Sequence, residues 1–588
     1  MITVEINEAN FEYDIHSLVK AFYPEHDVAV RTVFAEKPRQ YTREGKPTGE
    51  EPGQRPWEGE SAEEVPFHLE VLYGEAEITF SFYCGQETEP ALCGAVPVDF
   101  SDRRTTKNLL KQKLYGMLSD FSGRTLPWGM LTGIRPTKIP YAMLDEGASD
   151  AEIRAYMRET YFASDEKIDL SLEIAKRERE LLSRIDYEDG YSLYIGIPFC
   201  PSTCLYCSFT SYPIHTWRNR VDEYLDALCR EISHTAKMCR GKYLNSVYIG
   251  GGTPTSLEPE QLDRLITHIG ESFRLTDAQG RIVYGGLERD RITGTGTGRR
   301  NLPDTEPGPT RLERDRITGT GTGHRNLPDT EPGPTRLEGN RLTDGGFPSN
   351  HLLEFTVEAG RPDSITAEKL AVLKKHNISR ISINPQTMKE ETLRLIGRQH
   401  TAEQTRESFF LAREMGFDNI NMDLIAGLPE ERPDDVRRTM DEIAKLKPDN
   451  VTVHSLAVKR AARLRTQRED YGHLHIENTR ETIRLTADYC RRMGLFPYYL
   501  YRQKNMAGNF ENVGYAAPGK AGLYNILIME EKQTIMALGA GATTKVVSDH
   551  GNRIERAGNV KDITNYLERV DEMVERKRRL LHKIEIQQ

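Results

Sequence analysis

Three cysteines, Cys200, Cys204 and Cys207, lie within eight residues of sequence and directly follow the apolar run YIGIPF. A tetrahedral zinc site needs four ligands, usually supplied as two pairs, and the chain contains no second CxxC and no HxxxH pair. Three thiolates on one short loop can instead bind three irons of a [4Fe-4S] cluster, for which cysteine is the usual ligand. The fourth iron would then be open to a small molecule. The C-x3-C-x2-C spacing therefore predicts a cluster on these three residues.

A glycine-rich segment, GGGTPT at residues 250–255, follows the next apolar run of the chain. Glycines allow backbone groups to approach a ligand without interference from Cβ atoms. Alone, the segment fits either a tight turn between a strand and a helix or a dinucleotide-binding loop. The segment lies one strand–helix unit after the cysteine loop. In that position it indicates a binding site far more specifically than it would alone.

Both motifs belong to a rhythm of short apolar runs that alternate with amphipathic stretches between residues 191 and 458. The six runs are YSLYIGIP, NSVYIGGG, LEFTVEA, RISINPQ, INMDLIAGLP and VTVHSLAV. Six strands alternating with helices predict right-handed βα units and a parallel sheet. Such a sheet, closed or partly closed, is a six-unit relative of the (β/α) barrel, whose chemistry lies at the C-terminal ends of the strands. The cysteine loop and the glycine-rich segment both fall at such an end.

The rest of the chain predicts three further parts. Residues 1–100 alternate apolar and polar positions and predict an N-terminal α+β extension, whereas residues 101–188 predict a helical connector. The barrel is expected over residues 189–460, and residues 461–588 are expected to form a mostly helical C-terminal domain on the substrate side. The length supports this division, since 588 residues at about 100–200 per domain correspond to three or four units.

One segment, residues 286–346, does not follow this rhythm. Residues 287–311 are repeated at 312–336 with a single change, from Arg299 to His324, and a third copy begins at Leu337. The repeat is rich in Gly, Thr, Pro and Arg and lacks the apolar residues that a solenoid would bury. We therefore predict a disordered tandem-repeat insertion within the barrel.

Composition limits the partners of the chain. The net charge is −10, so a general attraction to nucleic acid or to an anionic membrane is not expected. No apolar run approaches the roughly 20 residues that span a bilayer, and the acidic N-terminus lacks a signal-peptide pattern. A cytoplasmic location is expected. In that reducing compartment the scattered cysteines predict buried or inert thiols rather than disulfides, namely Cys84, Cys93, Cys229, Cys239 and Cys490.

The cysteine and glycine motifs together resemble the radical S-adenosylmethionine (SAM) superfamily. The motif sequences YIxIPFC, CxYC and GGGTPT are similar to those of the oxygen-independent coproporphyrinogen III oxidase family. The N-terminal extension with LTGIRPTK at residues 131–138, and YLYRQKNMAGNFENVGYA at residues 499–516, resemble the HemZ-like branch of that family. The resemblance implies an α/β fold, a partial (β/α)6 TIM-like barrel, with a [4Fe-4S] cluster and SAM as cofactors.

The resemblance also implies roles for residues at the ends of successive predicted strands. The planar guanidinium of Arg398 can donate two hydrogen bonds to the methionine carboxylate of SAM. The Glu358 carboxylate suits the SAM cation or ribose, and Asp423 can accept hydrogen bonds from the ribose hydroxyls. The side chain of Gln386 can both donate and accept hydrogen bonds, and Ala457 would lie against the adenine of SAM. Singly, each would more often be a satisfied residue at a strand end, but together they favour a SAM site. The implied SAM-binding residues are Tyr194, Tyr206, Gly251, Gly252, Thr253, Glu358, Gln386, Arg398, Asp423 and Ala457.

The resemblance further implies a reaction. A reduced cluster would cleave SAM to a 5′-deoxyadenosyl radical, which would abstract hydrogen from a propionate of coproporphyrinogen III. Loss of CO2 and one electron would leave a vinyl group, and two rounds would give protoporphyrinogen IX. Basic residues would pair with the carboxylates of this tetrapyrrole substrate, and Arg502 and Lys504 are candidates. An electron donor such as flavodoxin or ferredoxin would be the protein partner.

Two positions depart from the family pattern. Gly196 stands where the family has His in YIHIPFC, and Phe209 stands where the oxidase has a further cysteine. Phe209 is shared with relatives that resemble heme chaperones, which keep the cluster but do not turn over coproporphyrinogen. Three functions are therefore compatible with the sequence: the oxidase, a heme chaperone, and an enzyme that acts on heme or another tetrapyrrole.

Overall fold

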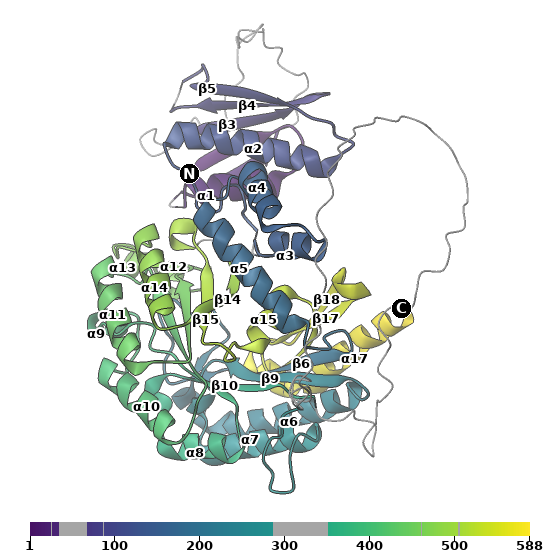
Figure 1. Ribbon diagram of the computed structural model, residues 1–588, viewed down its shortest axis with the longest axis vertical. Coiled ribbons are helices and arrows are strands. Elements are labelled where there is room, and N and C mark those ends of the chain that lie inside the picture. Colours follow the sequence, from purple (N-terminus) through teal and green to yellow (C-terminus); the bar gives the residue numbers. More distant parts are fainter. Residues whose placement is uncertain are drawn as a thin grey trace, which may run out of the picture.

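The computed structural model describes residues 1–24, 26–33, 67–85, 87–133, 135–285, 351–459, 461–503 and 506–587. The predicted tandem-repeat insertion at residues 286–346 and Lys504 lie outside these residues. An N-terminal unit lies at one end of the long axis of the molecule and the barrel at the other (Figure 1). No described helix is long and apolar enough to cross a lipid bilayer.

The N-terminal unit is a five-stranded sheet covered by two helices, as its alternating sequence predicts. The strands follow the order β2-β1-β3-β4-β5, with parallel pairing around β1 and antiparallel pairing from β3 onward. Helix α2 begins the predicted connector, but its apolar side chains belong to the core of this sheet. The elements are β1 (Ile2–Ile6), α1 (Glu12–Phe22), β2 (Val28–Thr32), β3 (His68–Tyr73), β4 (Glu77–Tyr83), β5 (Leu92–Pro97) and α2 (Arg103–Ser122).

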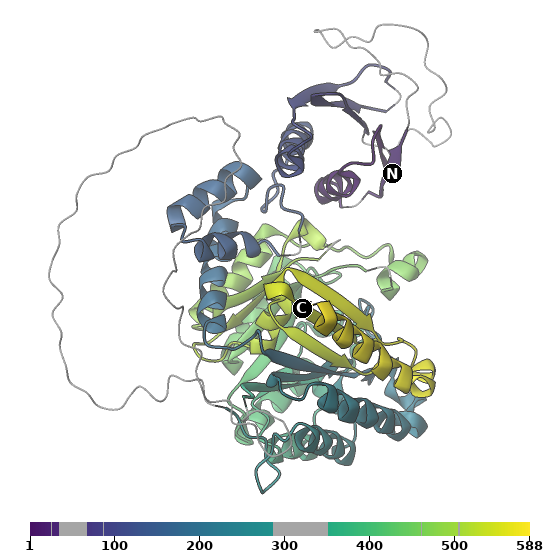
Figure 2. The same ribbon diagram turned by 90° about the vertical axis from the view of Figure 1, so that its right-hand side faces the viewer.

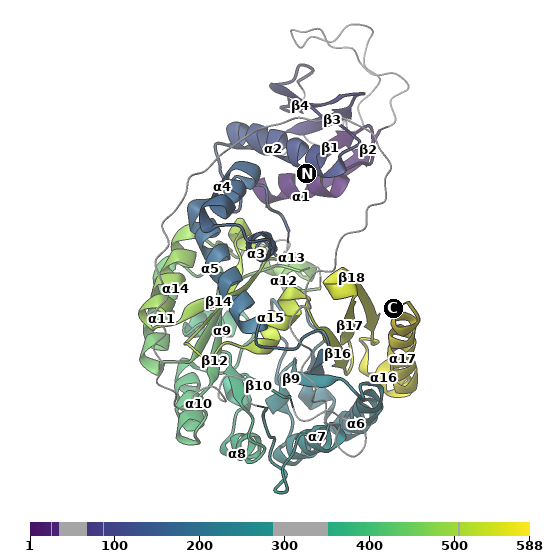
Figure 3. The ribbon, with the colours of Figure 1, turned by 45° about the vertical axis from the view of Figure 1, so that its right-hand side comes forward.

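Helices α3 (Lys138–Asp145), α4 (Asp150–Tyr161) and α5 (Asp165–Leu182) lie between the two units (Figures 1 and 3). Helix α4 begins with a capping box at Ser149, whose side chain and that of Glu152 satisfy each other's backbone N–H groups. Apolar side chains of α3, α4 and α5 share a core with the C-terminal part of the chain. These three helices lie within residues 101–188, for which the sequence predicts a helical connector.

The six predicted barrel strands are present, parallel and adjacent in sequence order. They are β6 (Gly190–Ile197), β9 (Tyr243–Gly251), β10 (Glu354–Gly360), β11 (Arg380–Ile383), β12 (Ile420–Ala426) and β13 (Asn450–Ser455). Figure 3 shows their helices on the outer side of the sheet, namely α6 (Val221–Met238), α7 (Pro259–Ser272), α8 (Ala367–Lys375), α10 (Ala402–Glu414) and α11 (Pro433–Leu446). Short elements β7 (Phe199–Cys200), β8 (Tyr212–Pro213) and α9 (Glu390–Leu395) lie in the connections. The partial (β/α)6 barrel is confirmed.

The C-terminal part contains more helix than strand, as predicted, but five strands that the sequence analysis did not foresee extend the barrel sheet at both edges. Strands β15 and β14 continue it antiparallel beyond β13. Strand β16 pairs parallel with β6 at the other edge, followed by antiparallel β17 and β18. The elements are α12 (Arg463–Thr466), α13 (Arg468–Tyr471), α14 (Arg480–Arg492), β14 (Phe496–Tyr501), β15 (Asn512–Ala516), α15 (Leu523–Glu530), β16 (Thr534–Leu538), β17 (Thr543–Ser548), β18 (Arg553–Gly558), α16 (Ile563–Glu568) and α17 (Val570–Gln587).

The C-terminal helix α17 lies along β17 and β18 (Figure 2). Val546 on β17 shares a small core with Leu580 and Ile584 of this helix. Of the scattered cysteines, Cys239 and Cys490 are buried as predicted. Cys93 is exposed, because it lies on β5, the edge strand of the N-terminal sheet.

Candidate functional site

A cavity of about 430 Å³ lies at the C-terminal ends of the barrel strands. We call it the cluster cavity, because the three predicted cluster cysteines line it. All ten predicted SAM-binding residues line it as well, although they come from positions spread between residues 194 and 457. The fold thus gathers the three predicted cluster ligands and all ten predicted SAM-binding residues, and the binding roles of these residues stay predictions.

The cysteine loop is held against the neighbouring strand ends by main-chain hydrogen bonds. The N–H groups of Gly252 and Thr253 donate to the carbonyls of Ile197 and Phe199, both at 2.7 Å. From the other side, the N–H of Leu205 donates to the carbonyl of Ile396 at 2.9 Å. The loop carrying the thiols is therefore fixed by the barrel rather than by the cysteines themselves.

The three thiols have few partners of their own. Thr253 Oγ1 lies 3.5 Å from the Sγ of Cys200, and Ser211 Oγ lies 3.6 Å from the Sγ of Cys207. Burial raises the pKa of Cys200 to about 12 and also raises that of Cys207. Metal binding deprotonates thiols, so iron would replace three protons here. A set of three weakly bonded thiols on one fixed loop fits a [4Fe-4S] cluster.

The glycine-rich segment fits closely against this loop. A Cβ atom on Gly252 would lie 2.5 Å from the carbonyl oxygen of Phe199 and 3.0 Å from the Sγ of Cys200. Gly251 has a φ of 105°, a conformation that side-chain-bearing residues rarely adopt. The GGGTPT motif is therefore needed for the close approach of two strand ends, and it leaves backbone groups facing the cavity.

Two carboxylates, Glu358 on β10 and Asp423 on β12, differ in their ionisation, and strand β11 lies between their two strands. Burial, reinforced by the Asp423 carboxylate, raises the pKa of Glu358 to about 7. Burial also opposes the ionised form of Asp423, but hydrogen bonds from His454 and Asn421 outweigh it and lower the pKa of that carboxyl. Near neutral pH the cavity therefore holds one carboxylate that is ionised and one that is poised to accept a proton.

Several buried polar atoms in the cavity wall lack hydrogen-bond partners among the described residues. They are Nε of Arg398, Nε and Nη2 of Arg380, and Oε1 of Gln386. The Arg398 guanidinium also contacts Tyr206 and Cys204 and donates to the carbonyl of Asn384. Buried polar groups without partners are unfavourable, so donors and an acceptor placed in this way fit a polar, zwitterionic ligand such as SAM.

The structure adds residues that the sequence analysis missed. Arg380, His454, Tyr248, Tyr499, Tyr501 and Tyr524 also line the cluster cavity. Tyr248 and Tyr524 stack with ring centroids 4.6 Å apart, and Tyr499 and Tyr501 stack at 6.2 Å. Arg380 and His454 are polar residues among apolar neighbours on predicted strands. This contrast could have marked them as candidate site residues. Tyr499 and Tyr501 lie on β14, a strand that was not predicted, and Tyr524 lies on helix α15.

Arg502 does not line the cluster cavity, and its predicted role toward the carboxylates of the substrate stays a prediction. Its guanidinium donates to the carbonyls of Leu131 and Asn509 and to the side chain of Asn509. These bonds hold the side chain away from the cluster cavity. Lys504, the second candidate, lies outside the described residues.

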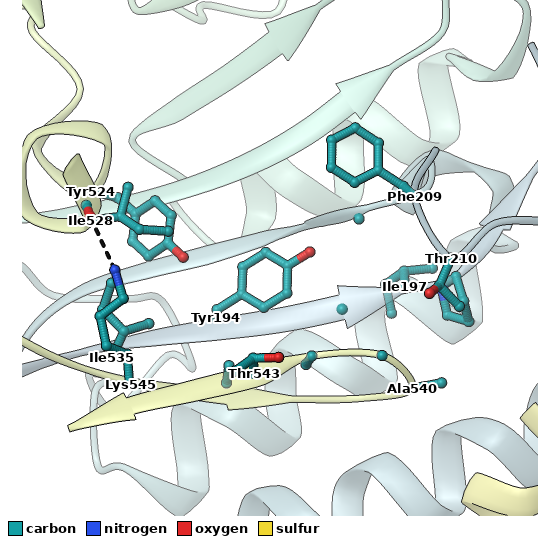
Figure 4. A pocket seen from close by; sticks show the side chains of 16 residues that line it. Tyr194, Ile197, Phe209, Thr210, Tyr524, Ile528, Ile535, Ala540, Thr543 and Lys545 are labelled. Atoms are coloured by element: carbon teal, nitrogen blue, oxygen red, sulfur yellow. Dashed lines mark hydrogen bonds between the residues drawn. The ribbon is translucent and has the colours of Figure 1, made fainter. Parts of the chain in front are cut away.

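A chamber of about 280 Å³ adjoins the cluster cavity (Figure 4). Tyr194, Phe209 and Tyr524 line both spaces. The side chains of the chamber are mainly apolar or aromatic, and Thr210, Thr543 and Lys545 add polar groups. Lys545 donates to the carbonyl of Ile528 at 3.4 Å, and its Nζ lies 2.9 Å from the Glu531 carboxylate. Gly196, one of the two departures from the family pattern, lines this chamber.

Comparison with known proteins identifies the family. Residues 321–443 match the radical SAM superfamily model. The oxygen-independent coproporphyrinogen-III oxidase-like protein HemZ of Bacillus subtilis is 36% identical over 484 residues, which cover 82% of each chain. The heme chaperone HemW of the same organism is 27% identical over 63% of this chain and 74% of the relative. The crystal structure of the coproporphyrinogen III oxidase HemN from Escherichia coli aligns with a TM-score of 0.43 and 20% identity, over 67% of this chain and 73% of that one.

Proteins of the radical SAM superfamily bind a [4Fe-4S] cluster and SAM, and the cluster cavity supplies a suitable set of thiols and polar groups for both. The identity to HemZ extends over most of both chains, so it includes more than the barrel. The chain therefore belongs to the radical SAM superfamily and, within it, to the family of oxygen-independent coproporphyrinogen-III oxidase-like proteins.

Proposed function

We propose that the chain is an oxidoreductase that converts propionate side chains of coproporphyrinogen III to vinyl groups with release of CO2, in the absence of oxygen. The observation that supports this activity best is the continuity of the cluster cavity with a tyrosine-lined wall and the adjoining chamber. Together these spaces extend beyond the ten residues assigned to SAM. The stacked tyrosines offer flat aromatic surfaces suited to the face of a pyrrole ring.

Each group of residues in the cavity has a defined task under this proposal. Cys200, Cys204 and Cys207 would hold the cluster, and the backbone at Gly251 and Gly252 would contact SAM. When bound, the two cofactors supply a carbon radical that removes hydrogen from the substrate. The protein positions the propionate and excludes water, since its contribution is orientation rather than the radical chemistry itself. A flavodoxin or ferredoxin would supply the electron for SAM cleavage, and a one-electron acceptor would take up the electron that remains on the substrate when CO2 leaves.

A heme chaperone is the second candidate, and Phe209 favours it. This ring is 68% exposed and lines both the cluster cavity and the adjoining chamber. It occupies the position where the oxidase carries an additional cysteine, and HemW proteins are among the relatives of the chain. A chaperone would retain the cluster without turnover of coproporphyrinogen.

One anaerobic experiment distinguishes these functions. The purified chain is reconstituted with iron and sulfide and then mixed with SAM, dithionite and coproporphyrinogen III. We expect 5′-deoxyadenosine together with a vinyl-containing product. Cleavage of SAM without vinyl product would indicate another tetrapyrrole substrate, and the absence of both products together with stoichiometric heme binding would indicate a chaperone.

A further inference from the structure

A separate cavity of about 290 Å³ lies where the N-terminal unit meets the end of strand β14. We call it the basic cavity, because Arg104, Lys107 and Lys111 of helix α2 and Arg502 after β14 line it. Among the described residues of its wall, Asp14 is the only carboxylate. Four cationic side chains therefore share one carboxylate in a confined space.

Two of these cations are almost fully enclosed by protein. Lys111 is 8% exposed, and its Nζ lies 3.4 Å from Oγ1 of Thr132 and 3.6 Å from the Asp14 carboxylate. Arg502 is 4% exposed, and its Nε has no hydrogen-bond partner among the described residues. Buried cations without compensating charge are unfavourable. Asp14 faces Lys111 and the Glu511 carboxylate acts on Arg502, so two carboxylates offset only part of the charge of the four cations.

The cations are close enough to influence one another. Burial lowers the pKa of Lys111, and Lys107 and Arg502 lower it further against the opposing effect of Asp14. Lys107 is half-buried and forms no ion pair with any described residue. An anion placed between these side chains would relieve their repulsion and would gain several charge-assisted hydrogen bonds.

We propose that the basic cavity binds a ligand carrying two or more acidic groups, either carboxylates or phosphates. Its walls also present the neutral hydrogen-bonding groups of Asn108, Thr132 and Gln503, which complement oxygen-rich anions. Gln503 lines the cluster cavity as well, so the two spaces are neighbours. The acidic groups can therefore belong to a free small anion or to the propionates of a tetrapyrrole that extends from the cluster cavity.

The location of the basic cavity gives its ligand a structural role. Helices α1 and α2 of the N-terminal unit form one wall, and the residues after β14 form another. An anion bound between them would contact both units, so its binding free energy would add to the stability of their association. The N-terminal extension would thus contribute a binding site that the barrel lacks by itself.

Titration calorimetry on the reconstituted full-length chain tests this proposal. The probes are inorganic phosphate, citrate and coproporphyrin III, each added in phosphate-free buffer. We expect Lys107→Gln to weaken binding of at least one probe about tenfold, which corresponds to about 1.4 kcal/mol, whereas Lys107→Arg should retain it. Lys113→Gln is the matched control, since Lys113 lies on the same helix and does not line the cavity.

The pattern among the probes identifies the source of the acidic groups. Weakening confined to coproporphyrin III would assign the site to the substrate, and weakening for phosphate or citrate would assign it to a free anion. Equal affinities of Lys107→Gln and the unmodified chain for all three probes, or no binding by the unmodified chain at millimolar concentration, would overturn the proposal. Because formation of 5′-deoxyadenosine is measured separately, either result is independent of the proposed enzymatic activity.

Discussion

At the scale of single residues, the cysteine loop makes the sharpest prediction. Changing Cys207 to Ser should remove most of the cluster iron, because a hydroxyl is a far poorer iron ligand than a thiolate. Iron content and the brown absorbance of the anaerobically reconstituted protein measure the effect. The backbone bonds that hold the loop come from Gly252, Thr253 and Leu205, so the fold should survive the substitution.

Cys229→Ser is the matched control for this change, since Cys229 is partly buried and lies on α6, away from the cluster cavity. Its iron content should equal that of the unmodified chain. Full iron content in Cys207→Ser would remove this residue from the ligand set.

Because the pKa of Glu358 is raised, we expect the affinity for SAM to depend on pH. Its pKa of about 7 means that the carboxyl is mostly protonated one pH unit below neutrality and mostly ionised one unit above. Only the ionised form attracts the SAM cation or accepts from both ribose hydroxyls. Affinity should therefore rise about tenfold between about pH 6 and about pH 8, as measured by anaerobic equilibrium binding.

Glu358→Gln separates this effect from other titrating groups. The amide is nearly isosteric and carries no charge, so its SAM affinity should be weak and nearly independent of pH over the same interval. A dependence as steep as that of the unmodified chain would exclude Glu358 as the responsible group.

At the scale of elements, the connection between α7 and β10 makes the next prediction: deleting residues 287–336 should leave cluster content and SAM cleavage intact. The N–H of Gly285 donates to the carbonyl of Leu352 at 2.8 Å, so the described ends of this connection lie side by side. Leu352 lies two residues before β10, at the edge of the sheet opposite the cluster cavity. Shortening a loop changes closure entropy by only about 0.6 kcal/mol per halving of its length, in the stabilising direction.

Iron content, melting temperature and 5′-deoxyadenosine formation are compared between the deletion and the full chain. A fall in activity beyond about tenfold, equivalent to about 1.4 kcal/mol, would show that the repeat contributes to the site. A lower melting temperature would show instead that it packs on the barrel.

At the scale of the whole molecule, a buried ion pair joins the connector helices to the C-terminal part. Lys167 on α5 and Glu511 before β15 lie 2.6 Å apart, with side chains 2% and 0% exposed, and Trp128 donates to the same carboxylate at 2.7 Å. Lys167→Met would leave Glu511 buried without its cation and should lower the free energy of unfolding by about 3–5 kcal/mol. Urea unfolding followed by tryptophan fluorescence measures this loss.

An exposed ion pair between the same parts provides the control. Arg484 on α14 lies 2.7 Å from Glu166 on α5, and both side chains are partly exposed to solvent. Arg484→Met should change the free energy of unfolding by less than about 1 kcal/mol, since solvent screens such pairs. Equal losses in the two variants would contradict a special contribution of the buried pair.

The sequence by itself determined the cluster loop, the glycine-rich segment and the six barrel strands. Cys200, Cys204 and Cys207 stand on one continuous loop, so their proximity needs no tertiary information. The strands were recognisable because a parallel sheet buried on both faces produces short continuous apolar runs. The resemblance to the family assigned residues as far apart as Tyr194 and Ala457 to one SAM site, and the geometry of the barrel is compatible with this because the C-terminal ends of its strands meet at one edge.

Only the tertiary structure decided what surrounds that site. Strand β16 pairs with β6 across more than half of the chain, and no local pattern specifies such a partner. The direction of Arg502 likewise depends on the carbonyl of Leu131, which is distant in sequence, and on that of Asn509. The basic cavity exists only where helix α2 meets the end of β14. The sequence shows which residues share a site when they are close along the chain or recur at successive strand ends. Contacts between distant segments depend on how the folded chain packs.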